Sequence, residues 1–236
     1  MNQKIVITPI ANIPLIKPGD DISNIIIDSI HKNGVTLNER DVVCVASKII
    51  SISENKYVDL NNITTTPQAK SLHKVVSRKD PRVIQLIIDQ AGREKENIKI
   101  NGSWIGAKNH IGRVLTSSGI DKVDENTVLT LPDNPDYSAS KIGEKIKSAV
   151  NKNVGVLITD SDGREGIAGA TQLCIGLYGV PPIRNRNDAP ETVCDMLAAA
   201  AGLVMGQRGN NIPVVVISGY KYTFNSRSKL KDAFWD

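Results

Sequence analysis

The chain has 236 residues, of which 40% are hydrophobic, 4% aromatic and 23% charged. A chain of this length buries about 70% of its unfolded surface, so it needs neither disulfides nor a structural metal to be stable. Lys and Arg outnumber Asp and Glu by 29 to 25. This small, dispersed excess and the scarcity of aromatic residues argue against an RNA-associated protein or any other nucleic-acid partner.

The predicted elements of the first half alternate between β-branched runs and amphipathic segments that begin with N-cap residues. Asp20, Asp21 and Ser23 offer the first cap, and Asp80 followed by Pro81 forms the clearest one. In chain order we expect a strand at Lys4–Thr8, a helix after Asp21 that ends near Gly34, strands at Asp41–Ala46 and Ile49–Ser53, and a helix from Pro81 to Gly92.

The second half predicts a similar mixture, so the expected fold class is α+β. In chain order we expect strands at Ile111–Leu115 and Thr127–Leu131 around a polar turn, a helix at Asp136–Val150, a buried strand at Val154–Thr159 that stops at Asp160, a glycine-rich loop, a helix at Pro190–Val204 and a strand at Val214–Ile217.

The cysteines and the N-terminus indicate the compartment. Cys44, Cys174 and Cys194 are far apart and odd in number, which is typical of buried thiols in a reducing compartment. The N-terminal segment lacks the apolar core of a signal peptide, and no apolar stretch approaches the roughly 20 residues of a membrane span. We therefore expect a cytoplasmic protein with no membrane partner.

Carboxylates are the most informative candidates for chemistry. Asp121 and Asp124 lie in a predicted turn, and Asp160 and Asp162 follow a buried strand. Oxygen ligands of this kind suit Mg²⁺ or Mn²⁺, which take their remaining ligands from water and substrate phosphates. Arg164 is placed to neutralise a transferring phosphoryl group. Ordinary turn chemistry explains an Asp before Gly equally well, so the residues alone leave both readings open.

The familiar catalytic and phosphate-binding motifs are absent from the sequence. It contains no glycine-rich loop of the G-x-x-x-x-G-K-[ST] or G-x-G-x-x-G type. Its histidines, His31, His73 and His110, do not accompany a nucleophile elbow. A triad hydrolase is therefore disfavoured.

Several segments together have the order of motifs of one known family. They are Ile13–Asp21 (IPLIKPGDD), Asp41–Lys48 (DVVCVASK), Lys79–Arg82, Ser118–Asp121 (SGID), Leu131–Pro132, Asp136–Ala139, Val154–Arg164 (VGVLITDSDGR), Met205–Gly206 and Ile212–Val216. In this order they resemble the GTP-dependent γ-glutamyl ligases that add L-glutamate to the deazaflavin coenzyme F-420. The resemblance covers most of the chain, and GID and ITDxxGR are its most specific motifs.

The resemblance implies an α+β fold of mixed sheets and packed helices. It implies a single domain over residues 1–236 in two entwined parts, divided near residues 1–130 and 131–236, and an intertwined homodimer. The partners it implies are GTP, L-glutamate and a carboxylate acceptor. The metals it implies are two divalent ions, Mg²⁺ or Mn²⁺, with K⁺ as an additional ion.

Site residues carry over by position. The implied metal ligands are Asp121, Asp160, Ser161 and Gln207. The implied GTP contacts are Ile13, Pro14, Leu15, Ile16, Ser47, Lys48, Asp124, Gly206 and Gly209. Asp160 and Arg164 are the implied catalytic residues. The implied reaction forms an acyl phosphate on the acceptor, and the amine of L-glutamate then displaces the phosphate.

Four departures from the family pattern leave alternatives open. Ile52 stands at the usual lysine, and Asp124 at the usual Asn. The segment at 165–169 lacks the arginine or aromatic residues that the family carries there, and the segment at 181–190 (PPIRNRNDAP) is shortened. Both favour weaker use of the F-420 precursor, unless Arg184 and Arg186 fold back over the site. The alternatives are the same chemistry on a folate or pterin acceptor, and a nucleotide-binding module without catalysis. The number of glutamates added and the preference for GTP over ATP stay undetermined.

Overall fold

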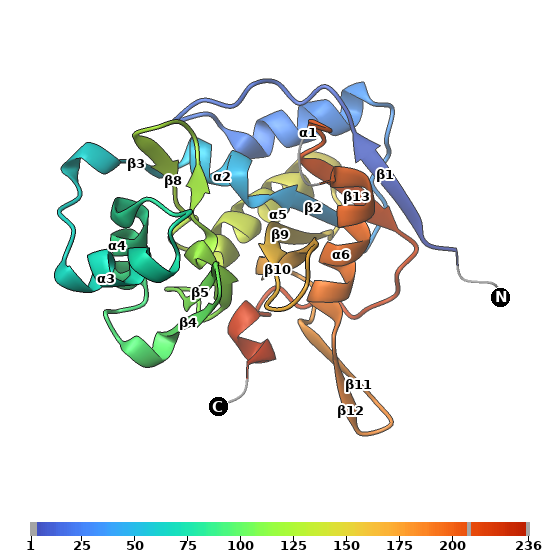
Figure 1. Cartoon of the computed structure of the whole chain (residues 1–236). Coiled ribbons are helices and arrows are strands. Elements are labelled where there is room, and N and C mark those ends of the chain that lie inside the picture. Colours follow the sequence, from blue (N-terminus) through green and yellow to red (C-terminus); the bar gives the residue numbers. More distant parts are fainter. Residues whose placement is uncertain (1–3, 207–208, 235–236) are drawn as a thin grey trace.

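The computed structural model describes residues 4–206 and 209–234. Its centre is a mixed five-stranded sheet in the order β1-β13-β2-β9-β10 (Figure 1). The strands are β1 (Val6–Ile10), β2 (Val42–Ala46), β9 (Gly155–Gly163), β10 (Ala170–Tyr178) and β13 (Val214–Ser218). β2 and β9 are parallel, and the other neighbouring pairs are antiparallel.

Helices cover both faces of this sheet because its strands are apolar on both faces. Side chains alternate along β9, so Val156 and Ile158 join one core while Leu157 joins the other. The helices of the first core are α1 (Ile22–Lys32), α2 (Ser47–Ser53) and α5 (Pro135–Val150), and the helix of the second core is α6 (Val193–Met205). We call the sheet with these helices the sheet body.

A second unit, residues 57–129, is inserted between α2 and α5, and we call it the insertion lobe. It has its own core, which includes Ile84, Ile87 and Ile105. Its helices are α3 (Pro67–Val75) and α4 (Pro81–Gln90), with 3-10 turns η1 (Leu60–Asn62), η2 (Lys95–Asn97) and η3 (Ser117–Gly119). Its strands are β3 (Tyr57–Asp59), β4 (Ile98–Asn101), β5 (Trp104–Lys108), β6 (Val114–Thr116), β7 (Asp121–Lys122) and β8 (Thr127–Leu129).

Polar contacts join the lobe to the far end of β9. The backbone N–H of Thr116 donates to Asp162 Oδ1 at 2.7 Å, and Asn101 Nδ2 donates to Glu165 Oε1 at 2.9 Å. Arg113 Nη2 forms an ion pair with Asp195 at the start of α6 at 2.9 Å. The lobe therefore contacts the same strand end that carries the predicted catalytic carboxylate.

A β-hairpin projects from the sheet body (Figure 1). It consists of β11 (Ile183–Arg186) and β12 (Ala189–Thr192), joined by Asn187 and Asp188. Both turn residues have positive φ, 51° and 61°, as a two-residue type I′ turn requires. The last described element is a 3-10 turn, η4 (Leu230–Ala233), which lies beside the lobe.

The α+β class and mixed sheets predicted from the sequence are confirmed, and most predicted elements occur within a few residues of their expected positions. The strand predicted at Ile49–Ser53 is wrong, because this segment is helix α2, which buries Ile49 and Ile50 in the first core. The predicted strand at Ile111–Leu115 begins only at Val114, after a turn at 109–112.

Two predicted boundaries are also wrong. β9 does not stop at Asp160 but continues to Gly163, because β10 pairs with it along this whole stretch. α6 begins at Val193, since Pro190 lies in β12 and pairs with Asn185.

The expected state of the cysteines is confirmed. Cys44, Cys174 and Cys194 are free and buried, and all three belong to the second core. Over the described residues, none of the helices has the length and apolar character needed to cross a bilayer.

Candidate functional site

One edge of the sheet gathers strand ends that favour ligand binding. β1, β2 and β9 point the same way, so their carboxyl ends meet the amino ends of β13 and β10 at this edge. A cavity of about 930 Å³ opens there, and we call it the edge cleft. Ligands of open α/β sheets bind in this position, beyond the carboxyl ends of parallel strands.

The edge cleft brings together most of the predicted site residues. Its wall is built from the segment after β1, the junction of β2 and α2, the middle of β9, and the segment between α6 and β13. The predicted residues that line it are Ile13, Pro14, Leu15, Ile16, Ser47, Lys48, Asp121, Asp160, Ser161, Gly206 and Gly209. Segments distant in sequence thus meet in one cavity.

Asp160 is a largely buried carboxylate in this cleft. Ser47 Oγ donates a hydrogen bond of 2.6 Å to Asp160 Oδ1. Burial raises the pKa of Asp160 to about 7, and the negative charges of Asp121 and Asp162 act in the same direction. A carboxylate in this position gains from a nearby cation, because positive charge favours its ionised form.

Asp121 reaches the same cleft from the insertion lobe. Its carboxylate is half-exposed, and Lys48 Nζ lies 3.0 Å from Asp121 Oδ2. This ion pair connects α2 of the sheet body to β7 of the lobe. Its exposure limits its worth to stability to about 1 kcal/mol or less. Its role therefore lies in placing an ammonium and a carboxylate together at the cleft.

The turn that leads into Asp121 has an unusual backbone. Ser117, Ser118 and Gly119 have φ values of 55°, 58° and 74°, so three successive residues are left-handed. Non-glycine residues adopt this conformation at a cost of about 1–3 kcal/mol each. A Cβ on Gly119 would lie 2.6 Å from Leu131 Cδ1, so glycine is required there for packing as well.

The carboxylates of the edge cleft have the chemistry of a site for a hard divalent cation. The described residues contain no cluster of three or more His, Cys, Asp or Glu side chains that would cage a metal. Mg²⁺ does not need such a cage, because it binds through one or two carboxylates and keeps water and substrate phosphates as its other ligands. Asp121, Asp160 and the exposed hydroxyl of Ser161 are oxygen donors that fit this mode of binding.

Three predicted residues stand apart from this group. Asp124 is exposed outside the cleft lining, and it accepts hydrogen bonds from the backbone N–H groups of Asn126 and Thr127, which lower its pKa. Arg164 is exposed just beyond the end of β9 and is also absent from the lining. Gln207 lies outside the described residues. The roles of Asp124, Arg164 and Gln207 stay predictions.

Sequence reasoning missed Gln172 as a lining residue. Gln172 lies on β10 directly opposite Ser161 of β9. Only 8% of its surface is exposed, and its Oε1 has no hydrogen-bond partner among the described residues. Pairing the two strands across the glycine-rich loop would have placed it beside Ser161, but the sequence-based prediction ended the first strand at Asp160.

Comparison with known proteins identifies the family. The family model described as F420-0:gamma-glutamyl ligase matches residues 11–219. The chain belongs to this family. As a member it is an enzyme of the ligase class. All of the lining segments of the edge cleft lie within the matched range.

Individual relatives lead to the same family assignment. The chain is 32% identical to the coenzyme F420:L-glutamate ligase of Methanothermobacter thermautotrophicus over 226 residues, which cover 90% of this chain and 88% of the relative. It is 32% identical to the enzyme of the same name from Methanopyrus kandleri, with 87% and 83% covered, and 31% identical to that of Archaeoglobus fulgidus, with 92% and 88% covered.

Proposed function

We propose that the protein is a GTP- and divalent-metal-dependent ligase that joins L-glutamate, through an amide bond, to the carboxylate of a coenzyme F420 precursor. The relatives carry the name of this activity. The observation that supports it here is the convergence of Lys48, Asp121 and Asp160, from three distant segments, in the edge cleft.

The proposed reaction has two steps. A carboxylate oxygen of the acceptor attacks the γ-phosphorus of GTP, the bond to the β–γ bridging oxygen breaks, and GDP leaves. The α-ammonium group of L-glutamate then loses one proton, and the resulting amine attacks the acyl carbon. The bond to the phosphate oxygen breaks, and the nitrogen gives up a second proton as the amide forms, one of the two protons going to the released phosphate and the other to solvent. The products are an amide, GDP and inorganic phosphate. No covalent enzyme intermediate is required.

The chain's own residues position and neutralise charge in this scheme. Lys48 lies at the mouth of the cleft, where its ammonium faces the triphosphate. Asp160 and Asp121, with Ser161, would hold Mg²⁺ or Mn²⁺, which when bound would neutralise the phosphate oxygens. Ser47 fixes the orientation of Asp160 through its 2.6 Å hydrogen bond. K⁺ is not needed by any of these roles.

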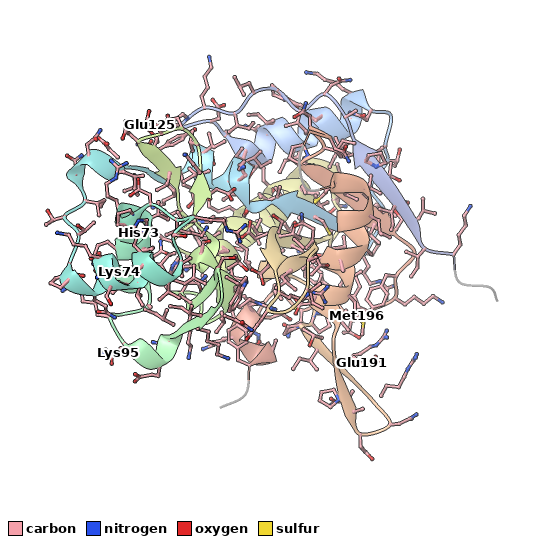
Figure 2. The ribbon with its side chains drawn as sticks, viewed as in Figure 1. His73, Lys74, Lys95, Glu125, Glu191 and Met196 are labelled. Atoms are coloured by element: carbon pink, nitrogen blue, oxygen red, sulfur yellow. The ribbon has the colours of Figure 1, made fainter. Side chains whose placement is uncertain are left out.

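A homodimer forms part of the proposal. α6 is apolar apart from Asp195 in its first turn, and one side of it faces the sheet. On its other side Met196 and Leu203 are 49% and 83% exposed. Met196 lies near the projecting hairpin, which carries Glu191 (Figure 2). An apolar helix of this kind is usually covered on both sides. We expect light scattering to report a dimer, and a monomer at micromolar concentration would contradict this part.

The decisive experiment is a phosphate-release assay with GTP, L-glutamate and a panel of carboxylate acceptors. Release should require all three substrates and Mg²⁺ or Mn²⁺, and mass spectrometry should detect the glutamylated acceptor. The panel should contain the F420 precursor and a folate, because the departures at 165–169 and 181–190 bear on the choice of acceptor. GTP hydrolysis that is independent of every acceptor would contradict the proposal.

A further inference from the structure

Gln172 is a neutral amide that lines the edge cleft, whose charged lining residues, among those described, are Lys48, Asp121 and Asp160. Its side chain lines the edge cleft, but 92% of the residue's surface is covered, and the described residues offer its Oε1 no donor. A buried carbonyl without a donor costs about 1–3 kcal/mol. In a cleft, a ligand that supplies the missing hydrogen bond offsets this cost.

The fold holds this side chain in place. Gln172 is in register with Ser161 across the β9–β10 pair, so both side chains lie on the α6 side of the sheet. α6 has a glycine at the point of contact, where a Cβ on Gly202 would lie 2.7 Å from Gln172 Cγ. The stem of Gln172 is thus confined between the sheet and α6. The terminal amide can still turn about its last torsion, which presents either its oxygen or its nitrogen to the cleft.

The order of the strands indicates which substrate lies beside Gln172. Residues 13–16, which are among the proposed nucleotide contacts, follow β1 at one end of the sheet edge. Lys48 and Asp160 lie at β2 and β9, where the phosphates are proposed to bind. Gln172 lies one strand further, on β10. It is therefore on the side of the proposed phosphate site away from β1, beyond the segment proposed to contact the nucleotide, so a substrate other than the nucleotide would contact it.

We propose that Gln172 binds the incoming amino acid, with its amide oxygen accepting from the α-amino group and its amide nitrogen donating to a carboxylate of the same molecule. This inference rests on the proposed ligase function. An amide offers one acceptor and two donors, which suits a zwitterion, whereas a phosphate or a metal ion would use one kind only. The neutral side chain also adds no negative charge to repel a dicarboxylate.

The test compares Gln172→Leu with the unchanged enzyme in the phosphate-release assay. Leucine keeps most of the contact with Gly202 but cannot form hydrogen bonds. The KM for L-glutamate should rise about tenfold or more, because hydrogen bonds to charged groups are lost. The KM for GTP and the half-saturating Mg²⁺ concentration should change less than about twofold. Gln172→Asn retains an amide on a shorter side chain, so its KM for L-glutamate should lie between those of the unchanged enzyme and Gln172→Leu.

Gln90→Leu is the matched control. Gln90 ends α4 of the insertion lobe, and its Oε1 is also buried without a partner among the described residues, but it is absent from the cleft lining. This variant should leave all three constants unchanged. If Gln172→Leu alters the KM for GTP or the Mg²⁺ requirement instead, or leaves the KM for L-glutamate within twofold, the inference is wrong.

A binding measurement separates this inference from the proposed function. Calorimetric titration of L-glutamate into the enzyme with Mg²⁺ and a non-hydrolysable GTP analogue needs no turnover. Binding to the unchanged enzyme that is weakened by Gln172→Leu supports the inference, even if every acceptor in the panel fails. Absence of L-glutamate binding to the unchanged enzyme, or equal binding to both, overturns it.

Discussion

The sheet body and the insertion lobe each contribute one carboxylate to the edge cleft, under different conditions. Asp160 is on a central strand, is largely buried and accepts a hydrogen bond from Ser47. Asp121 is on a two-residue strand of the lobe, is half-exposed and is paired with Lys48. The body thus supplies a fixed, weakly solvated ligand, while the lobe supplies an accessible one.

This difference shows how the sheet body and the insertion lobe contribute differently to the cleft. The body provides every other described lining residue, including the segments proposed to bind the nucleotide. The lobe has a separate core and reaches the cleft through the strained turn before Asp121. The predictions below therefore begin with the carboxylate of the body.

The largest expected effect is that of Asp160→Asn. The amide can still accept from Ser47, so the fold should be kept, and thermal unfolding should show a stability at least equal to that of the unchanged protein. Metal-dependent phosphate release should fall about a thousandfold, because a charged ligand is lost. Asp121→Asn should lower phosphate release less than Asp160→Asn does, because the carboxylate of Asp121 is better solvated. Asp28→Asn, on the exposed side of α1 and outside the cleft lining, is the control, and a similar loss from it would contradict this division.

Replacing Lys48 tests the contact between the two units. Lys48→Met removes the cation that pairs with Asp121 and faces the proposed triphosphate. The KM for GTP should rise about ten- to a hundredfold, the range expected for a lost charge-assisted hydrogen bond. Lys122→Met is the matched control, because Lys122 follows Asp121 directly but does not line the cleft. Equal effects of both changes would show that only the net charge matters.

Asp136 of the sheet body should make stability depend on pH. Its carboxylate accepts the backbone N–H groups of Leu177 at 2.8 Å and Leu230 at 3.1 Å, yet burial outweighs these bonds and raises its pKa. A raised folded pKa means that its favourable contribution is complete below the unfolded pKa and is lost as pH rises through the folded value. The free energy of unfolding of the unchanged protein, minus that of Asp136→Asn, should therefore decrease as pH rises from 4 to 7 in urea titrations. A constant difference would show that the pKa of Asp136 is not raised.

The smallest effect is expected from a substitution that restores a cation to the sheet body's side of the cleft. Ile52 lines the cleft and stands where the family usually has lysine. Ile52→Lys should lower the KM for GTP by no more than about fivefold, since a solvated ion pair contributes up to about 1 kcal/mol. Ile52→Met, which is equally long but uncharged, separates charge from shape. No change relative to Ile52→Met would show that Lys48 already meets the need for a cation.

Local signals in the sequence correctly predicted the helices that begin with an N-cap residue. The first helix begins at Ile22 because Asp21 caps it by accepting from the backbone N–H of Asn24 at 3.1 Å. The Asp80–Pro81 pair marks the start of α4 in the same way. The segment Ile49–Ser53 was mispredicted because its isoleucines favour strands, whereas burial of Ile49 and Ile50 decides in favour of a helix.

The candidate site was predictable in its residue types but not in its assembly. Hard-cation chemistry indicated Asp121, Asp124, Asp160 and Asp162, and resemblance to the family selected Asp121 and Asp160 among them. That the two carboxylates share one cavity depends on strand order and on the placement of the lobe, which periodicity does not encode. Gln172 was missed because its importance comes from burial and from the partner that it lacks.

The left-handed turn at residues 117–119 also has a consequence for how this enzyme tolerates mutation. Few residue types fit three successive positive φ angles, and Leu131 excludes any side chain at Gly119. In a saturation library position 119 should accept only glycine, and positions 117 and 118 should accept serine, glycine, asparagine and few others, although none of the three lines the cleft. The exposed turn at 123–126 should accept almost any residue. Near Asp121, substitutions should therefore accumulate on its C-terminal side, in the turn at 123–126, and not in the turn at 117–119.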